Sequence, residues 1–234
     1  DVDTVMTPLD SIRYIKSYLR SGFVSMDART GAVKAYVGGV DFTHFTYDMA
    51  LSGRRQIGST AKPFLYSLCM SNGMSPCDVA PNVQKSYGNW TPRNGSRARY
   101  GQMVTLKWAL AQSNNWVSAH LMSLVNPDDY LRLLQDFGIN IYGVPSSLVL
   151  CLGPNEASVC EMVSAYTTFA NSGIHCSPMF VTKIEDSDGN VVANFQPRMN
   201  EVISEESAYK MLDILKAVMN GGTGSRMRYK YKVE

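Results

Sequence analysis

Ser59 and Lys62 are the two residues of this sequence best suited to covalent chemistry. They lie in the segment Arg-Gln-Ile-Gly-Ser-Thr-Ala-Lys-Pro, residues 55–63, which leads into an apolar run at 64–70. The run predicts a helix, and the spacing of three places both side chains at its N-terminus on one face. A hydroxyl beside an amine is the arrangement of a serine nucleophile activated by lysine. Unpaired N–H groups of the first turn, that of Ser59 included, would stabilise an oxyanion there.

The Ser-x-x-Lys spacing alone has little value, because it occurs again from Ser207 to Lys210. In that second copy, apolar residues recur at helical spacing, which predicts a structural amphipathic helix. A further signal supports Ser59: the triplet Ser113-Asn114-Asn115 follows it by 54 residues and interrupts a predicted helix. Serine and asparagine favour helix ends, so a plain helix cap is the structural alternative for Ser113 and Asn115.

Together these two motifs resemble the first two active-site motifs of the penicillin-binding transpeptidases. The resembling segments are Gln-x-Gly-Ser-x-x-Lys-Pro and Ser-x-Asn, and the similarity covers nearly the whole chain. It is closest to the transpeptidase domains of bifunctional, class A proteins. Other resembling stretches are Trp90–Asn94, Val104–Leu110, Ala165–Gly173 and Gly221–Gly224.

The resemblance implies acyl transfer on peptidoglycan stem peptides that end in D-Ala-D-Ala, carried by lipid II-derived glycan strands. Ser59 would attack the penultimate carbonyl, and Lys62 would be the base, with its pKa lowered by burial or a neighbouring positive charge. Ser113 would pass the proton towards the leaving amine. Asn115 would hold the Lys62 ammonium or the substrate amide. β-Lactams would acylate the same serine as inhibitors.

One family motif, Lys-Thr-Gly or Lys-Ser-Gly, does not occur in the 234 residues. The stretch Gly222-Thr223-Gly224 is no substitute, because it follows a predicted helix and lacks the lysine. In the family such a stretch precedes the missing motif, which we expect shortly after Glu234. Residues 1–234 are therefore interpreted as a single transpeptidase domain that is C-terminally incomplete, slow or inactive by itself, and part of an active parent protein.

The chain begins at Asp1 with no signal peptide or bilayer-spanning run. We therefore expect a piece of a longer polypeptide. The resemblance implies that a membrane anchor and a glycosyltransferase domain precede it, and that the protein works in the periplasm, at the outer face of the bacterial inner membrane. The anchor outside this sequence would be its only membrane contact.

The composition limits the partners, cofactors and disulfides that this protein could have. A hydrophobic fraction of 45% in 234 residues is enough for one substantial core. A net charge of +2 gives no reason to expect a nucleic-acid partner. The three histidines are scattered and no Cys-x-x-Cys pair occurs, so neither a metal nor another cofactor is expected. The five cysteines leave pairing open, with Cys69–Cys77 or Cys151–Cys160 as the possible bridges.

Local signals predict the framework around the motifs. Capping residues predict helices that begin after Thr7, Thr105, Asn126, Ser158 and Ser204. The first helix should close at Gly22, and the second should break at 112–115 and resume. Residues 75–101, rich in Pro, Asn, Gly and Ser, predict a long ordered loop over a surface.

Alternating residues predict the strands. Residues 23–37 and 180–195 predict two hairpins, the second turning at Asp188-Gly189. Basic and apolar residues alternate through 226–233, which predicts a closing strand with one basic face. Hairpins and a strand separated by helices indicate an α+β fold, an antiparallel sheet flanked by helices. This agrees with the resemblance, which implies a central antiparallel sheet between helical layers.

Three alternative functions remain. The first is a serine β-lactamase or D,D-carboxypeptidase, although no deacylating glutamate motif is recognisable. The second is a β-lactam-binding sensor or a catalytically inactive homologue. The third is a polyanion-binding domain that uses the basic tail strand, for which a solvated sheet face is the simpler interpretation.

Overall fold

The computed structural model describes residues 3–232 and confirms the α+β class. The helices are α1 (Pro8–Ser17), α2 (Lys62–Ser71), α3 (Leu106–Ala111), α4 (Asn115–Met122), α5 (Pro127–Asp136), α6 (Val159–Ala170), α7 (Glu205–Gly221) and α8 (Arg226–Tyr231). Two 3-10 turns accompany them, η1 (Gly58–Ala61) and η2 (Leu148–Leu152). None of the helices in the described part combines the length and apolar character that crossing a bilayer requires.

The strands pair antiparallel, two at a time. The pairs are β1 (Phe23–Met26) with β2 (Val33–Val37), β3 (Arg54–Gln56) with β6 (Glu156–Ser158), β4 (Val79–Pro81) with β5 (Met103–Thr105), β7 (Ile174–Cys176) with β10 (Met199–Glu201), and β8 (Lys183–Glu185) with β9 (Val191–Asn194). Both predicted hairpins, β1–β2 and β8–β9, are confirmed. Within residues 3–232 the antiparallel sheet therefore exists as separate two-stranded units.

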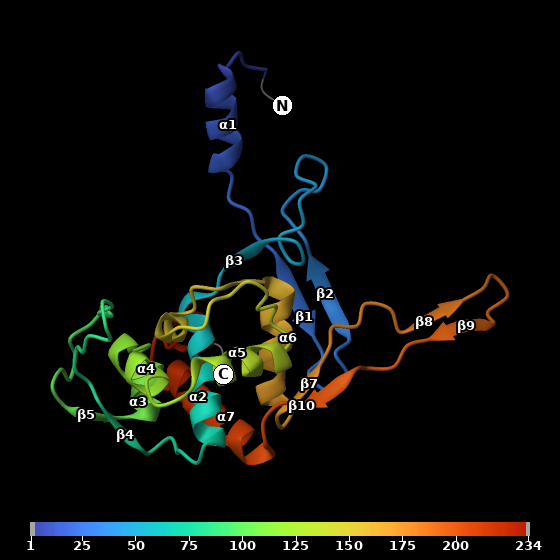
Figure 1. Ribbon diagram of the computed structural model, residues 1–234. Helices are drawn as coiled ribbons and strands as arrows, with labels where there is room; N and C mark the ends of the chain where they lie inside the picture. Colours follow the sequence, from blue (N-terminus) through green and yellow to red (C-terminus); the bar gives the residue numbers. More distant parts are fainter. Residues whose placement is uncertain (1–2, 233–234) are drawn as a thin grey trace.

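Helix α2 runs through the middle of the helical part of the molecule (Figure 1). Eight of its ten residues are buried. Its aromatic residue Phe64 lies 4.9 Å from the ring of Phe137 and 5.9 Å from that of Phe169, centroid to centroid. A helix that is apolar on all sides belongs in the core, and this one is surrounded there by α4, α5 and α7. The burial holds the N-terminal end of α2, which carries Lys62, in a fixed position.

The predicted capping residues form the expected helix caps. Thr7, Thr105, Asn126 and Ser204 each accept a hydrogen bond from a backbone N–H in the first turn of their helix. Ser158 and Glu161 form the predicted capping box of α6. The predicted interruption at 112–115 is also confirmed, because α3 ends at Ala111 and α4 begins at Asn115. These features depend only on neighbouring residues, which is why the sequence predicts them.

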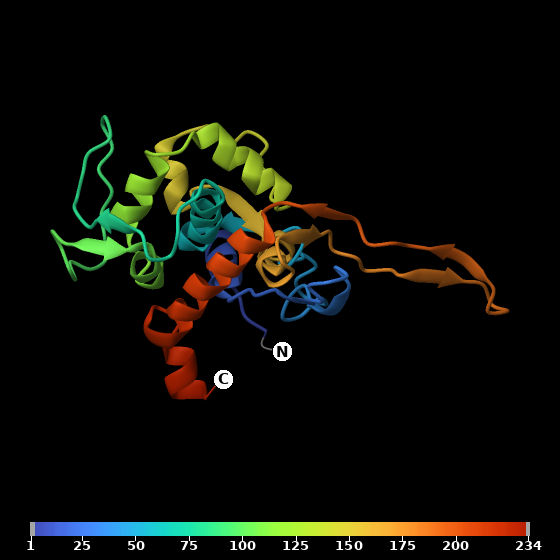
Figure 2. The same cartoon turned by 90° about the horizontal axis from the view of Figure 1, so that it is seen from below.

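The predicted end of the first helix is wrong. Helix α1 ends at Ser17, and Gly22 lies on the extended approach to β1. A side chain at Gly22 would meet the backbone of Ala50 at 2.9 Å, so this glycine permits a close approach between two chain segments. Helix α1 buries none of its residues and stands away from the body, as does the β8–β9 hairpin (Figures 1 and 2).

The prediction of a closing strand at 226–233 is also wrong. Residues 226–231 form helix α8, and Val233 lies outside the described residues. A strand needs a partner for its backbone groups, whereas a helix satisfies them internally. Arg228 and Lys230 in the last turn are favourably placed against the helix dipole. The basic strand face on which the polyanion alternative depended is therefore absent from the described tail.

The second Ser-x-x-Lys copy is structural, as predicted. Ser207 is buried in α7 and accepts a hydrogen bond from the hydroxyl of the capping residue Ser204, and Lys210 pairs with Glu206. All five cysteines, which lie in the described part of the chain, are free thiols. The sequence had left both possible bridges open.

Candidate active site

The side chain of Lys62 is the centre of the site. It is fully buried at the first position of α2, and its ammonium donates three hydrogen bonds across to the turn between α3 and α4. The acceptors are the Ser113 carbonyl at 2.6 Å, the Ser113 hydroxyl at 3.0 Å and Asn115 Oδ1 at 2.6 Å. The structure thus brings three of the four predicted site residues together, from segments about 50 residues apart.

The environment of Lys62 favours its neutral form. Burial, which removes water from the ammonium, lowers the pKa of Lys62 to about 8. The charge interaction with the nearby Cys151 thiol opposes this shift. The outcome is an amine that is charged at neutral pH and loses its proton within about one pH unit above it.

The Ser113 backbone is bent to reach Lys62. Its φ is +52°, in the left-handed region that is unfavourable for residues other than glycine, aspartate and asparagine. This conformation turns both the carbonyl and the hydroxyl of one residue towards the same ammonium. Strain of this kind persists only where the surrounding structure holds it.

The long loop at 75–101 holds Asn115. Asn115 Nδ2 donates to the Arg93 carbonyl at 2.7 Å, and the Asn115 backbone N–H donates to Asn94 Oδ1 at 2.9 Å. Because Nδ2 is engaged with a carbonyl, Oδ1 must face the Lys62 ammonium. The loop is therefore ordered over a surface, as predicted, and it sets the orientation of a site residue.

Asn114 is a supporting residue that the sequence identified only as part of a motif. It is almost fully buried, accepts from the Val117 N–H as the N-cap of α4, and donates to Asn82 Oδ1 at 2.8 Å. Asn82 in turn donates to the carbonyls of Ala98 and Arg99. Sequence reasoning missed Asn82, because nothing local distinguishes it from the other polar residues of the loop.

Ser59 lies on the 3-10 turn η1, just before α2, and its residue is exposed. Within residues 3–232 its hydroxyl has no hydrogen-bond partner, and its backbone N–H is likewise free. The Lys62 ammonium points to Ser113 and Asn115 instead of to Ser59. The predicted nucleophile is therefore unengaged, while the opposite turn holds the amine of the lysine three residues on.

Glycine 153 supports the Ser59 turn, and the sequence did not single it out. Its carbonyl accepts from the Gly58 N–H at 2.9 Å, and its φ is +64°. A side chain at Gly153 would lie 2.1 Å from the Gly58 carbonyl oxygen. Two tyrosines hold the next carbonyls: Tyr166 donates to Thr60 and Tyr130 donates to Ala61. The only sequence signal for Gly153 was its glycine identity, which does not reveal a distant contact.

The stretch Gly221–Gly224 supports the opposite turn. The Ala111 carbonyl accepts from the Thr223 N–H at 3.0 Å, and a side chain at Gly222 would lie 2.3 Å from that carbonyl oxygen. Gln112 donates to the Gly221 carbonyl at 3.1 Å. This family-like stretch therefore lies against the end of α3, next to Ser113.

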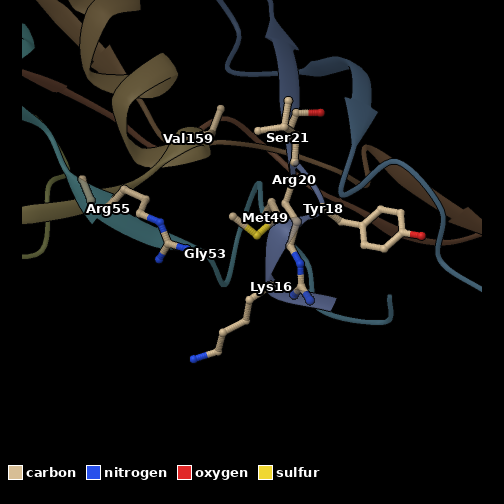
Figure 3. A pocket seen from close by; sticks show the side chains of 11 residues that line it. Lys16, Tyr18, Arg20, Ser21, Met49, Gly53, Arg55 and Val159 are labelled. Carbon is tan, nitrogen blue, oxygen red and sulfur yellow. The ribbon is translucent and has the colours of Figure 1, made fainter. Parts of the chain in front are cut away.

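A separate basic pocket of about 680 Å³ lies between the end of α1 and strand β3 (Figure 3). Lys16, Arg20 and Arg55 line it, and none of the three is in an ion pair with another residue of the part described. Figure 3 shows Met49 between Arg20 and Arg55. No lining residue belongs to η1, α2 or the 112–115 turn, so this pocket is distinct from the Lys62 site.

The Lys62 site holds the groups that acyl transfer through a serine ester would need. It offers a free hydroxyl, a free backbone N–H at the same residue, and a nearby amine whose proton affinity suits neutral pH. Ser113 adds a hydroxyl in contact with that amine. No residue in this arrangement other than Ser59 combines exposure with an unengaged nucleophilic group.

Comparison with known proteins identifies close relatives of the chain. Residues 21–234 match the family model for the penicillin binding protein transpeptidase domain. Penicillin-binding protein 1A of Neisseria meningitidis is 36% identical over 217 residues, covering 88% of this chain and 27% of that protein. The homologue from Aquifex aeolicus is 32% identical over 214 residues, covering 89% and 29%. The chain thus spans little more than a quarter of these relatives.

The fold is shared with solved structures. The crystal structure of penicillin-binding protein 1A from Haemophilus influenzae superposes with a TM-score of 0.83, at 24% sequence identity. The match covers 92% of this chain and 38% of that one. At this identity, the likeness shows a common fold.

Proposed function

Since the chain belongs to the penicillin-binding protein transpeptidase domain family, we propose that it catalyses acyl transfer through a Ser59 ester during peptidoglycan cross-linking. The donor is a stem peptide ending in D-Ala-D-Ala, and the acceptor is an amine of a neighbouring stem. The observation that carries this proposal is the buried Lys62 ammonium, held by the Ser113 carbonyl and hydroxyl and by Asn115, beside the exposed Ser59.

The proposed reaction has two halves. The Ser59 oxygen attacks the carbonyl carbon of the penultimate D-Ala, and the hydroxyl proton passes to the neutral amine of Lys62. The peptide C–N bond then breaks, and the departing amine of the terminal D-Ala takes up a proton, relayed by the Ser113 hydroxyl. In the second half the acceptor amine attacks the ester carbonyl, loses its proton to the same groups, and releases Ser59.

The neighbours of Lys62 define the remaining roles. Asn115 Oδ1 holds the protonated amine after the first proton transfer, at the 2.6 Å separation seen here. The free Ser59 N–H at the start of α2 supplies one donor to the oxyanion. Removing one of two such donors typically costs about 10²–10³ in rate. We expect the 234 residues to react slowly, because they supply this donor without the Lys-Thr-Gly or Lys-Ser-Gly motif.

We propose that residues 1–234 belong to one domain. A single hydrophobic core joins residues from η1 and from α2 to α7, and the β1–β2 hairpin packs on α6. As part of a larger protein, this domain would act on glycan strands at the outer face of the inner membrane, where β-lactams would inhibit it. These whole-protein features are proposals for this chain, which spans 27% to 29% of the length of the relatives compared.

The carboxypeptidase, β-lactamase and sensor alternatives use the same serine. They differ in whether an amine, water or nothing attacks the ester. The relatives from Neisseria meningitidis and Aquifex aeolicus are both penicillin-binding proteins 1A. Cross-linking is therefore favoured. Rapid turnover of penicillin would support the β-lactamase alternative in its place.

The test is covalent labelling with a fluorescent penicillin followed by intact-mass analysis. We expect one slowly formed adduct per chain in the wild-type protein and none in Ser59→Ala. Ser207→Ala is the matched control, since it changes the structural copy of the motif, and it should label like wild type. Labelling that persists in Ser59→Ala would show that Ser59 is not the residue that forms the ester.

A further inference from the structure

The basic pocket between the end of α1 and strand β3 gathers positive charge with no acid beside it. Its described lining residues include Lys16, Arg20 and Arg55 but neither aspartate nor glutamate. None of these three cations is in an ion pair within residues 3–232. Arg55 donates one N–H group to the Arg54 carbonyl at 3.0 Å and keeps the others free. Because like charges repel, an anion that binds to such a cluster stabilises it.

Further donors line the same pocket. Segment 19–22 forms one wall, and its backbone N–H groups and the Ser21 hydroxyl have no hydrogen-bond partner among residues 3–232. The cations lie on two sides, since Figure 3 shows Met49 between Arg20 and Arg55. A phosphate group carries up to two negative charges and has oxygens in several directions, whereas a carboxylate has one charge and two oxygens in a plane. The arrangement therefore favours a phosphate.

Aromatic contacts hold one of the two guanidinium groups in place. The Arg20 guanidinium lies over the Phe45 ring, 4.7 Å from its centroid. The centroid of the Phe45 ring lies 5.6 Å from that of Tyr18, which lies 5.2 Å from that of Tyr14. A guanidinium that stacks on a ring keeps the N–H groups at its edges available. Arg20 is thus fixed against the 39–49 loop and can still donate to an anion.

A second pocket, of about 630 Å³, adjoins the basic pocket. The two have four lining residues in common, Tyr18, Leu19, Arg20 and Met49. The other walls of this aromatic pocket are mainly aromatic and aliphatic, with contributions from Tyr14, Ile15, Val40, Phe45 and Tyr47. The single acid among its described lining residues, Asp41, is paired with His44. A ligand that spans both pockets would have its charge in one and an apolar group in the other.

We propose that the two pockets together bind an amphiphilic phosphate ester. Its phosphate lies among Lys16, Arg20 and Arg55, and its apolar part lies in the aromatic pocket. A nucleic acid fits less well, because its phosphates follow a line and need an extended basic stripe, whereas these cations surround one hollow. Neither pocket is lined by Ser59, Lys62 or the 112–115 turn, so this binding does not depend on the proposed acyl transfer.

The experiment is a calorimetric titration of the chain with hexyl phosphate. We expect saturable binding that weakens as the salt concentration rises. Two probes test the two parts of the ligand: inorganic phosphate lacks the apolar group, and hexanoate carries a carboxylate in place of the phosphate. Each should bind about tenfold more weakly than hexyl phosphate, because each loses the contacts of one pocket.

The double variant Arg20→Gln/Arg55→Gln should bind hexyl phosphate about tenfold more weakly than wild type. The matched control is Arg29→Gln/Arg198→Gln. It removes the same total charge at two exposed positions that line neither pocket, and it should bind like wild type. The comparison separates a local site from the general attraction of a positively charged protein for anions.

A second arm identifies the source of the ester, which is either a free molecule or a lipid headgroup. The probe is sedimentation with phosphatidylcholine vesicles that contain phosphatidic acid, and vesicles of phosphatidylcholine alone are the blank. Binding of hexyl phosphate alone, lost in Arg20→Gln/Arg55→Gln, supports the proposal with a free ester as the ligand. Vesicle binding that the same variant loses supports it with a lipid headgroup as the ligand.

The proposal is overturned if neither hexyl phosphate nor the phosphatidic acid vesicles bind. It is also overturned if hexanoate binds as tightly as hexyl phosphate, or if the two double variants bind alike. Should Arg20→Gln/Arg55→Gln fail to fold, Arg55→Gln replaces it, with Arg198→Gln as its control.

Discussion

Lys62 donates to both oxygens of Ser113, the carbonyl at 2.6 Å and the hydroxyl at 3.0 Å. This double contact requires the left-handed backbone of Ser113, at φ +52°. One residue thus supplies a fixed anchor for the amine and a hydroxyl that can relay its proton. The two functions can be separated by mutation, because only the hydroxyl belongs to the side chain.

Ser113→Gly and Ser113→Ala both remove the hydroxyl and keep the carbonyl contact. We expect equal losses in the rate of penicillin acylation, of about 10²-fold, within the usual range for a group that transfers a proton. Stability should differ, with the glycine variant about 1 kcal/mol more stable than the alanine variant because glycine tolerates the left-handed backbone. Stopped-flow acylation and urea unfolding give the two quantities.

Ser172 offers a control for this prediction, since it has the same φ of +52° and lies outside the site. Ser172→Gly and Ser172→Ala should show the same stability difference and unchanged acylation. Unequal acylation rates for the two Ser113 variants would mean that backbone position, not the hydroxyl, limits the reaction.

The acylation rate should follow the protonation of Lys62. If the neutral amine is the base, the rate rises about tenfold per pH unit below the pKa of about 8 and levels off above it. Asn115→Ala removes an acceptor that stabilises the ammonium, so the midpoint of the profile should move to lower pH. Single-turnover acylation between about pH 6 and 10 measures both. A flat wild-type profile would remove Lys62 as the base.

The lowered pKa of Lys62 also predicts a pH-dependent stability. Between about pH 8 and 10.5 the unfolded chain keeps the Lys62 proton while the folded chain has lost it, so rising pH favours folding. Over that window Lys62 contributes up to about 3 kcal/mol, as an order of magnitude. Below pH 8 both states are protonated and the contribution is constant.

Lys62→Met removes this contribution, together with the charge interaction between Lys62 and the Cys151 thiol. Burial raises the pKa of the Cys69 and Cys151 thiols to about 12, which lowers stability above about pH 9 in both proteins. The difference in free energy of unfolding, wild type minus Lys62→Met, should therefore still increase from pH 8 to 10. Urea unfolding of both proteins at several pH values measures this difference in free energy. A difference that falls with pH would contradict the buried position of the amine.

Gly153→Ala should damage the Ser59 turn. The new methyl group would lie 2.1 Å from the Gly58 carbonyl oxygen, and φ is +64°. We expect a loss of about 3 kcal/mol, from backbone strain and overpacking together, and slower acylation. Gly143→Ala is the matched control, because its φ of +73° carries the same strain with no atom within 4 Å. It should cost only about 1 kcal/mol and leave acylation unchanged; equal effects would show that the contact with Gly58 is unimportant.

Local features account for what could be predicted from the sequence. The caps at Thr105, Ser158 and Ser204 each act on a backbone group within three residues, and the hairpins follow from short turns and alternation. The strand prediction at 226–233 failed because alternation describes side chains only. Whether an alternating segment becomes a strand depends on a neighbouring strand, which local sequence does not contain.

The sequence by itself determined the types and the spacing of the site residues: a serine and a lysine three apart at a helix start, and a Ser-x-Asn triplet at a helix break. Only the tertiary structure decided that Lys62 reaches Ser113 and Asn115, that the 75–101 loop orients Asn115, and that Gly153 holds the Ser59 turn. These contacts join segments tens of residues apart, and packing around the buried helix α2 brings them together. The same packing removes water from Lys62 and so sets its pKa, which no spacing along the chain can specify.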